Sequence, residues 1–297
     1  MVAKIIDGNA VARHVRQECA AQTRALKARG ITPGLAVIIV GDNPASKVYV
    51  ANKVRACTEV GLASTVYAFE ADTPDTVVEA KIQALNADPA VHGILVQLPL
   101  PTHFDVKRVL ACISVDKDVD GFHLYNVGAL AQGETVFPPC TPYGVSKMLE
   151  YENIPVAGQN VVVVGASNIV GKPMAMMLMQ RDATVAICHA KTRDLAQFTI
   201  LADILVVAAG VPNLILAQMV RTGAVVIDVG INRLPNGKLV GDVDFEGVRQ
   251  KASYISPVPG GVGPMTITML VHNTVQAATR CQYPAGLSLS PPHSPVS

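Results

Sequence analysis

The sequence predicts an α/β fold with two domains, each a mostly parallel sheet flanked by helices. A chain of 297 residues suggests two globular halves, because a domain has about 150 residues as a rule. Apolar runs rich in Val and Ile begin near Leu35, Ser64 and Gly93, and these starts are 29 residues apart, as is typical of β-α-β units. A second series begins near Val161, Thr184, Ile204 and Val225. Its runs are apolar throughout, which predicts strands buried on both faces of a Rossmann-like domain.

The domain boundaries follow from the order of these runs. Residues 1–140 are expected to form the first domain and residues 141–263 the second, with a cleft between them. Segment 116–142 is dense in Gly, Pro and Asp and is predicted to be the crossing between domains. Helical periodicity predicts helices over 10–29 and 264–280, and the second is expected to return to the first domain. Residues 281–297 offer little apolar surface and are expected to be disordered.

The composition excludes several classes of protein. The chain has 24 basic and 23 acidic residues, only 4% aromatic residues and no Trp, so a nucleic-acid partner is not expected. The longest apolar stretch, 200–220, contains Asp203 and Pro212 and is too interrupted for a membrane-spanning helix, which needs about 20 apolar residues. The first residues, MVAKIIDGN, do not resemble a secretory signal, which predicts a cytoplasmic protein.

The cysteines are widely spaced. They are Cys19, Cys57, Cys112, Cys140, Cys188 and Cys281. No CxxC motif and no histidine at metal-ligand spacing accompanies them, so neither a metal site nor a disulfide framework is predicted. We expect reduced thiols, most of them in the core.

The run VVVVGASNIVGKP, residues 161–173, predicts a buried strand, a Gly-rich turn and the start of a helix. Such a turn offers free N–H groups and a positive dipole end to a phosphate. The spacing departs from GxGxxG, because Ser167 replaces the second Gly and Gly171 comes one place late. The run is equally consistent with a dinucleotide site and with an ordinary strand-to-helix turn.

The next predicted strand ends at His189, where an NAD-specific site usually has an acidic residue against the ribose. This chain instead has Lys191 and Arg193 close by, which favours the 2′-phosphate of NADP. The alternative is that both are solvated charges on the surface, which is the more common place for Lys and Arg.

In the first domain, a helix capped by Asp42 or Ser46 is predicted to run to about Gly61. Tyr49 and Lys53 then lie one turn apart on one face. A lysine that gains and loses a proton near neutral pH must be partly desolvated, and a phenol one turn away can hold it in place. The alternative is an amphipathic surface stripe.

Three further segments are candidates for ligand contact. Gln97 ends the third strand in QLPLP, at the sheet edge where open α/β sheets bind ligands, although it is equally consistent with a capping amide. Asp118 and Asp120 lie in the crossing segment, where Asp before Gly is also typical of a turn. The stretch PVPGGVGP, residues 257–264, allows backbone to approach a ligand closely, and its alternative is a rigid linker.

Taken in order, the segments YVANK, QLPLP, DVDG, GASNIVGKP and PVPGGVGPMT resemble the bifunctional methylenetetrahydrofolate dehydrogenase/methenyltetrahydrofolate cyclohydrolase family. The resemblance covers residues 5–278. It implies oxidation of 5,10-methylenetetrahydrofolate with NADP, followed by hydrolysis to 10-formyltetrahydrofolate, in one-carbon metabolism and purine biosynthesis. It also implies tetrahydrofolate derivatives as partners and a homodimer formed through the nucleotide domain.

The residues that match the family's folate site are Tyr49, Lys53, Gln97, Asp120, Pro259, Gly260 and Gly261. By this match Lys53 is the general acid and base of the hydrolysis, and Gln97 holds it in the useful protonation state. Tyr49 stacks on the folate, Asp120 binds the polar pterin edge, and the 259–261 backbone lies against the substrate.

The positions that match the family's cofactor site are Gly165, Ala166, Ser167 and Ile231, with the site continuing near His189 and Ala190, and Lys191 is expected to join them. Many members have Arg in place of Ala166 and Ser in place of Ala190, so Lys191 or Arg193 is expected to contact the 2′-phosphate. Leu124 replaces a usual Pro, which implies only a local loop change. Two alternatives stay open: another two-domain dehydrogenase, for example one acting on a cyclic hydroxy acid, and a nucleotide-sensing protein without turnover.

Overall fold

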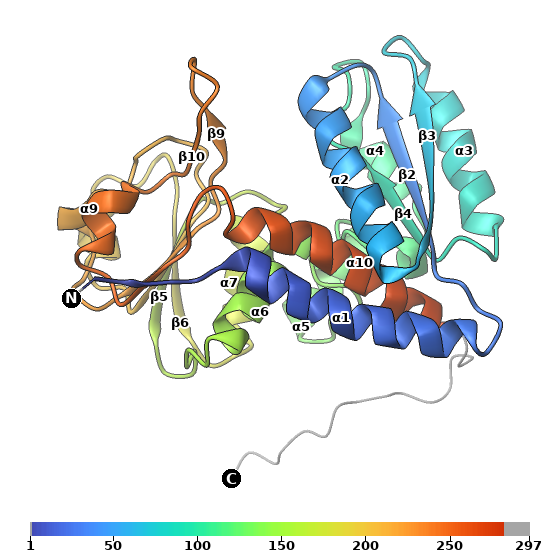
Figure 1. The fold of residues 1–297 in the computed structure, drawn as a ribbon. Helices are drawn as coiled ribbons and strands as arrows, with labels where there is room; N and C mark the ends of the chain where they lie inside the picture. The colour runs from blue at the N-terminus through green and yellow to red at the C-terminus, as the bar shows by residue number, and fades with distance from the viewer. Residues whose placement is uncertain (1, 282–297) are drawn as a thin grey trace.

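The computed structural model describes residues 2–281 and has two lobes (Figure 1). One lobe contains a three-stranded parallel sheet and the other a six-stranded parallel sheet. Helices cover both sheets, so the predicted α/β class with two helix-flanked sheets is confirmed. The C-terminal segment that was expected to be disordered lies, from residue 282 on, outside the described residues.

The small sheet has the strand order β3-β2-β4. Its strands are β2 (Gly34–Val40), β3 (Ala63–Phe69) and β4 (Gly93–Val96). Leu35 lies opposite Ser64 on one side and Gly93 on the other. The three strand starts predicted from the 29-residue spacing are therefore in register, because each β-α unit returns the chain to the same level of a parallel sheet.

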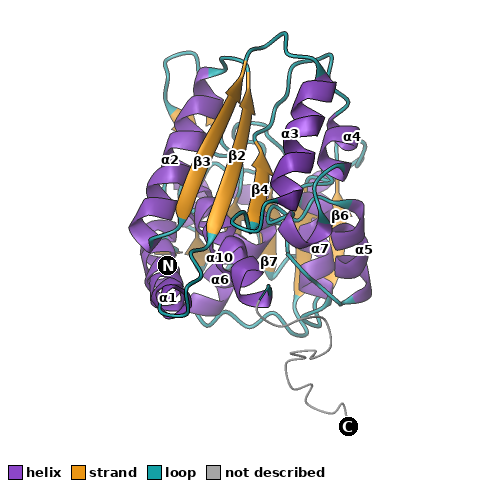
Figure 2. Cartoon of the chain, turned by 90° about the vertical axis from the view of Figure 1, so that its right-hand side faces the viewer, coloured by secondary structure: helices purple, strands orange, loops and turns teal. Residues whose placement is uncertain are grey.

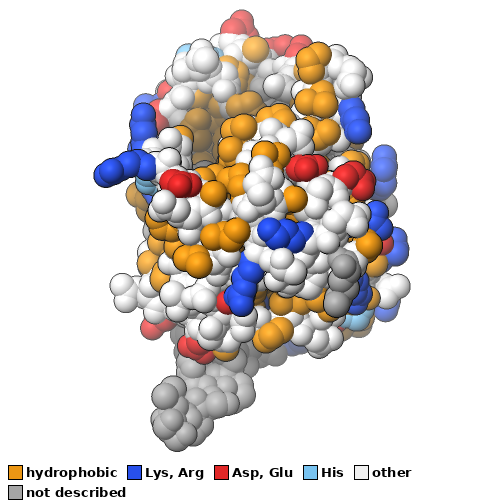
Figure 3. Space-filling model, turned by 90° about the vertical axis from the view of Figure 1, so that its left-hand side faces the viewer, with side chains coloured by type: hydrophobic (Ala, Val, Ile, Leu, Met, Phe, Trp, Pro, Cys, Tyr) orange, Lys and Arg blue, Asp and Glu red, His pale blue; other side chains and the backbone are white. Residues whose placement is uncertain are grey.

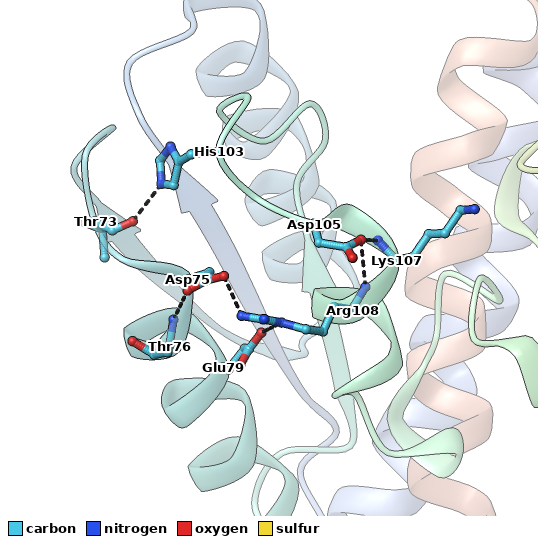
Figure 4. Close-up of polar contacts among 8 residues, drawn as sticks. All are labelled: Thr73, Asp75, Thr76, Glu79, His103, Asp105, Lys107 and Arg108. Atoms are coloured by element: carbon cyan, nitrogen blue, oxygen red, sulfur yellow. Dashed lines mark hydrogen bonds and ion pairs between the residues drawn. The ribbon is translucent and has the colours of Figure 1, made fainter.

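Helices cover both faces of this small sheet, with α2 (Pro44–Val60) on one side and α3 (Asp75–Ala87) and α4 (Val106–Ala111) on the other (Figure 2). Arg108 of α4 ties the outer pair together: its Nε donates to Glu79 Oε1 at 2.6 Å, and it also pairs with Asp75 (Figure 4). Asp105 caps α4 through the N–H groups of the two residues that follow Val106.

The large sheet has the strand order β1-β11-β8-β7-β5-β6. Its strands are β1 (Lys4–Ile5), β5 (Asn160–Val164), β6 (Thr184–Cys188), β7 (Ile204–Val207), β8 (Val225–Asp228) and β11 (Tyr254–Ile255). Val161, Ile204 and Val225 pair in one row, again at the predicted starts. The central strands β7 and β8 are buried along their whole length, as their uninterrupted apolar runs predict.

Strand β1 departs from the predicted domain assignment. The sequence predicts one domain over residues 1–140, but Lys4 and Ile5 pair with Tyr254 and Ile255 at the edge of the large sheet. A two-residue strand has too short a pattern to indicate its partner. Its place is decided by packing, since Ile6 is fully buried in the core shared by both lobes.

Two long helices, α1 (Gly8–Lys27) and α10 (Val262–Arg280), lie side by side and join the lobes (Figure 1). Asp7 caps α1 by accepting from the N–H groups of Asn9 and Ala10. Helix α10 also packs on α2 and on α6 (Cys140–Tyr151), so the returning C-terminal helix contacts the first lobe as expected. The two lobes therefore share one continuous apolar cluster.

The remaining elements connect the sheets. They are α5 (Leu124–Gln132), α7 (Gly171–Met179), α8 (Leu195–Thr199), α9 (Phe245–Arg249), an antiparallel pair β9 (Asn232–Arg233) and β10 (Leu239–Val240), and the 3₁₀ turns Val115–Lys117 and Ala217–Met219. The crossing segment 116–142 is thus partly helical, since α5 lies within it.

Basic and acidic side chains are interspersed over the outer face of the large-sheet lobe, in agreement with the near-zero net charge (Figure 3). Between residues 2 and 281, no helix has the length and apolar content needed to cross a membrane. Four of the six thiols, those of Cys19, Cys57, Cys140 and Cys188, are buried, as predicted.

Candidate active site

A cleft of about 1000 Å³ lies between the two lobes. Tyr49 of α2 lines it from the first lobe, and Ile231, which follows β8, lines it from the second. The segment Pro257–Pro264 and the beginnings of α1 and α10 complete its wall. The cleft therefore lies at the carboxyl end of β8, where open α/β sheets bind ligands.

Helix α2 positions the two residues that the sequence singled out in the first lobe. It begins at Pro44, which suits the first helical turn, and it is capped by Asn43 rather than by the predicted Asp42 or Ser46. It ends at Gly61, whose φ of 84° is readily available only to glycine. Tyr49 is 37% exposed in the cleft, and burial raises the pKa of its phenol.

Lys53 lies one turn after Tyr49 and is only 8% exposed. Its Nζ donates a hydrogen bond to Gln97 Oε1 at 3.0 Å, which is the contact that the resemblance implies. Gln97 in turn donates its Nε2 to the carbonyl of Leu98 at 2.6 Å. The amide oxygen of Gln97 is thereby turned toward the ammonium group, and the lysine is held by the end of β4.

Asp120 completes this cluster. Burial raises the pKa of its carboxyl group, and the nearby positive charge of Lys53 opposes part of that rise. The loop that carries Asp120 is held by Asp118, which is 2% exposed and accepts hydrogen bonds from the N–H of His123 and from Asn126 Nδ2. Burial raises the pKa of Asp118 to about 6. Asp118 therefore shapes a turn, and Asp120 faces the lysine.

Two residues of this cluster carried no sequence signal. Cys140 Sγ and Asn273 Nδ2 both donate to the carbonyl of Val119, next to Asp120, at 3.4 and 2.8 Å. Burial raises the pKa of the Cys140 thiol well above its ordinary value, so it is neutral. Asn273 belongs to α10, more than 150 residues away along the chain, so only the packing of α10 brings it here.

The segment Pro259–Gly261 lines the cleft as predicted. Gly260 has a φ of 99°, a conformation that a side chain would strain. A Cβ on Gly8 would lie 1.7 Å from the carbonyl oxygen of Gly261, so the start of α1 is pressed against this backbone. The segment is thus a fixed wall of the cleft and does not merely link two elements.

The Gly-rich turn after β5 has the close packing expected of a dinucleotide site. A Cβ on Gly165 would lie 2.1 Å from the carbonyl oxygen of Ala208, and one on Gly171 would lie 1.9 Å from that of Gly165. Ser167 Oγ accepts from the N–H groups of Val170 and Gly171 just before and at the start of α7, a contact that its sequence position did not indicate.

The N–H groups of residues 166–169 donate to no protein acceptor within the described part of the chain. Successive free N–H groups in a turn suit a phosphate, so this turn fits the diphosphate of a nicotinamide cofactor. His189, Ala190 and Lys191 are exposed just after β6, where Lys191 N–H donates to His189 Nδ1 at 3.1 Å. Between residues 2 and 281, no three His, Cys, Asp or Glu side chains gather as metal ligands do.

The predicted site residues therefore fall into three groups. Tyr49, Ile231 and the segment 259–261 line the cleft. Lys53, Gln97 and Asp120 form a mostly buried cluster one helical turn from Tyr49 and are not among the residues that line it. The turn at 165–167 and the segment 189–191 lie outside the cleft, at the carboxyl ends of β5 and β6.

Comparison with known proteins assigns both halves of the chain. Residues 6–120 match the catalytic domain of tetrahydrofolate dehydrogenase/cyclohydrolase, and residues 139–282 match its NAD(P)-binding domain. The chain belongs to this family. The crossing segment separates the two matches, so Lys53, Gln97 and Asp120 lie in the catalytic domain and the Gly-rich turn lies in the NAD(P)-binding domain.

Relatives in the tetrahydrofolate dehydrogenase/cyclohydrolase family resemble this chain over nearly its full length. The bifunctional protein FolD of Nitrosospira multiformis is 63% identical over 278 residues, which cover 94% of this chain and 96% of the relative. The FolD crystal structure from Campylobacter jejuni has a TM-score of 0.93 at 52% identity, covering 94% of this chain and 99% of that one. FolD from Trypanosoma brucei, solved with NADP and an inhibitor, has a TM-score of 0.92 at 38% identity, covering 95% and 99%.

Proposed function

We propose that this chain oxidises 5,10-methylenetetrahydrofolate to 5,10-methenyltetrahydrofolate with NADP and then hydrolyses the product to 10-formyltetrahydrofolate, in one-carbon metabolism. The observation that carries the proposal is the hydrogen bond between Lys53 and Gln97, one helical turn from Tyr49. Tyr49 lines a cleft whose opposite wall belongs to the NAD(P)-binding domain. Relatives named bifunctional protein FolD support it.

The oxidation needs chiefly orientation, because NADP supplies the hydride acceptor. Ile231 and the backbone of residues 259–261 lie in the cleft opposite Tyr49, where a folate held by Tyr49 would face the nicotinamide end of a dinucleotide. Lys191 and Arg193 are exposed after β6, and we assign the contact with the 2′-phosphate to them because Ala166 and Ala190 offer no polar side chain. NADP rather than NAD is our proposal on that ground and on the NADP complex of the Trypanosoma brucei relative.

The hydrolysis needs a group that accepts a proton from water, and we assign this step to Lys53 Nζ. Water attacks the methenyl carbon and loses a proton to Lys53 Nζ, after which the bond from that carbon to N5 breaks and N5 takes up a proton. The attached hydroxyl loses its proton as the formyl group forms, so one proton is released overall. Gln97 orients Nζ for both transfers. The role we assign to Asp120, which Lys53 influences electrostatically, is to bind the polar pterin edge.

We also propose a homodimer that forms through the NAD(P)-binding domain. Strand β6 is an edge strand of the large sheet, and Ile187 on it is 41% exposed. An edge strand with exposed apolar side chains is a ready surface for a second copy. Light scattering of the purified protein tests this. The cytoplasmic location stays a prediction.

The experiment that tests the function follows the methenyl absorbance band after purified protein is mixed with methylenetetrahydrofolate and either NADP or NAD at equal concentration. We expect a transient rise and then decay, faster with NADP. No change with either cofactor in a well-folded sample would contradict the proposal and favour a nucleotide-sensing protein. Another two-domain dehydrogenase is disfavoured because the catalytic-domain match is specific to the tetrahydrofolate family.

A further inference from the structure

Two buried carboxylates lie beneath the cofactor edge of the large sheet. Asp228, the last residue of β8, is 3% exposed, and Asp242 is fully buried. Asp228 Oδ1 accepts from the N–H groups of Gly230 and Asp242, and its Oδ2 accepts from that of Val243, all at 3.0 Å. Asp228 thus ties the end of its own strand to the segment that follows β10.

Asp242 accepts hydrogen bonds from two further segments of the domain. Its Oδ2 accepts from the N–H groups of Ala209 and Gly210 at 2.7 and 2.8 Å, directly after β7. Its Oδ1 accepts from Asn232 Nδ2 at 2.8 Å. One carboxylate therefore joins the end of β7 to the residue that follows Ile231.

These two ends belong to different parts of the cofactor site. Gly165 of the Gly-rich turn packs against the carbonyl of Ala208, the neighbour of Ala209. Ile231 lines the cleft from the second lobe, opposite Tyr49. Asp242 consequently sets the spacing between the turn that fits a diphosphate and the wall that faces the substrate.

The surrounding backbone is shaped to these carboxylates. A Cβ on Gly230 would lie 2.1 Å from Asp242 Oδ1, and one on Gly241 would lie 1.8 Å from Asp228 Oδ2. Neither glycine has a positive φ, so the carboxylate groups are what exclude a side chain there. Within residues 2–281, neither carboxylate takes part in an ion pair. Burying two unpaired acids is costly, and such costs are typical of functional sites.

We propose that Asp242, supported by Asp228, is a positioning residue of the dehydrogenase that aligns the two parts of the dinucleotide site. This proposal rests on the proposed NADP-dependent function. Asp242 contacts none of Tyr49, Lys53 or Gln97, so the hydrolysis of methenyltetrahydrofolate, which uses no NADP, does not depend on it.

The test is Asp242→Asn, because an amide of the same size must place its NH₂ group against at least one of the three donors. We expect the KM for NADP and the Kd from calorimetric titration to rise at least fivefold. Hydrolysis of methenyltetrahydrofolate without NADP should stay within twofold of the parent protein. Asp244→Asn is the matched control, because Asp244 lies two residues further along and caps α9 away from the cleft, and it should change neither activity.

The second variant is Asn232→Ala, which removes only the hydrogen bond to Asp242 Oδ1. It tests the same proposal if Asp242→Asn does not fold. Its expected effect is a rise of about threefold in the KM for NADP. An unchanged KM in a folded variant overturns the proposal, and so does a parallel loss of both activities, which indicates a purely structural role. Absence of NADP-dependent turnover in the parent protein refutes the proposed function instead.

Discussion

Lys53 Nζ lies 3.0 Å from Gln97 Oε1, although the two residues belong to a helix and to the end of a strand that are 44 positions apart. Because Gln97 Nε2 donates to the Leu98 carbonyl, it is the amide oxygen of Gln97 that faces the lysine. The amine is thereby held at one place, one helical turn from Tyr49 in the cleft, as the proposed role in general acid–base catalysis requires.

Replacing this lysine should separate the two activities. In Lys53→Met the hydrolysis of methenyltetrahydrofolate should fall by about 100-fold or more, the size expected for loss of a general acid and base. NADP binding, measured by calorimetric titration, should stay within twofold, because Lys53 does not belong to the cofactor site. Lys47→Met on the exposed side of the same helix is the control. Hydrolysis at the parent rate in Lys53→Met contradicts the role.

Changing the partner of Lys53 should move the pH dependence of the reaction. In Gln97→Glu a carboxylate replaces the amide and favours the protonated amine, so the rise in the rate of hydrolysis with pH should move upward by about one pH unit or more. The measurement is the pH–rate profile for methenyltetrahydrofolate, with Gln83→Glu on the outer helix α3 as the control. An unshifted profile with reduced amplitude indicates that Gln97 acts only through packing.

Two helical glycines should respond in opposite ways to alanine. At Gly128 in α5 a Cβ meets nothing within 4 Å, so Gly128→Ala should raise the free energy of unfolding by about 0.5–1 kcal/mol through helix propensity. At Gly144 in α6 a Cβ would lie 2.8 Å from Met265 Cβ in α10, so Gly144→Ala should lower it by roughly 1–3 kcal/mol. Urea titration measures both changes in the free energy of unfolding. If both changes had the same sign, the packing of α6 on α10 would be contradicted.

Asp228 should make stability depend on pH. Burial raises its pKa from 3.8 to about 7 in the folded chain, so between these values the folded state holds a proton that the unfolded state has lost. The contribution of Asp228 to the free energy of unfolding is therefore greatest below pH 4 and falls by roughly 1.4 kcal/mol per pH unit up to about pH 7.

The measurement compares the parent protein with Asp228→Asn by urea titration from pH 4 to pH 8. The difference between their free energies of unfolding should decrease with rising pH and level off above about pH 7. Asp244→Asn serves as the control, since Asp244 is a helix cap outside the core. A difference that does not vary with pH means that Asp228 keeps the same charge state throughout this range.

Much of the fold was predictable because it depends on local repetition. The starts near Leu35, Ser64 and Gly93 came from an even spacing of apolar runs, and a parallel sheet brings such starts into register. Strand β1 was not predictable, because two residues have no measurable period and their partner, Tyr254 and Ile255, is about 250 positions away.

The sequence by itself determined the sheet class, the three strands of the small sheet and strands β5, β6, β7 and β8 of the large one. Through five ordered motifs it also singled out Lys53, Gln97, Asp120 and the Gly-rich turn. Only the tertiary structure decided that Asn273 and Cys140 hold the backbone beside Asp120, and that Asp242 joins the end of β7 to Asn232. The physical reason is that periodicity and motifs record contacts between neighbours in the chain. A buried polar group, by contrast, takes whichever partner the packing of distant elements brings within about 3 Å.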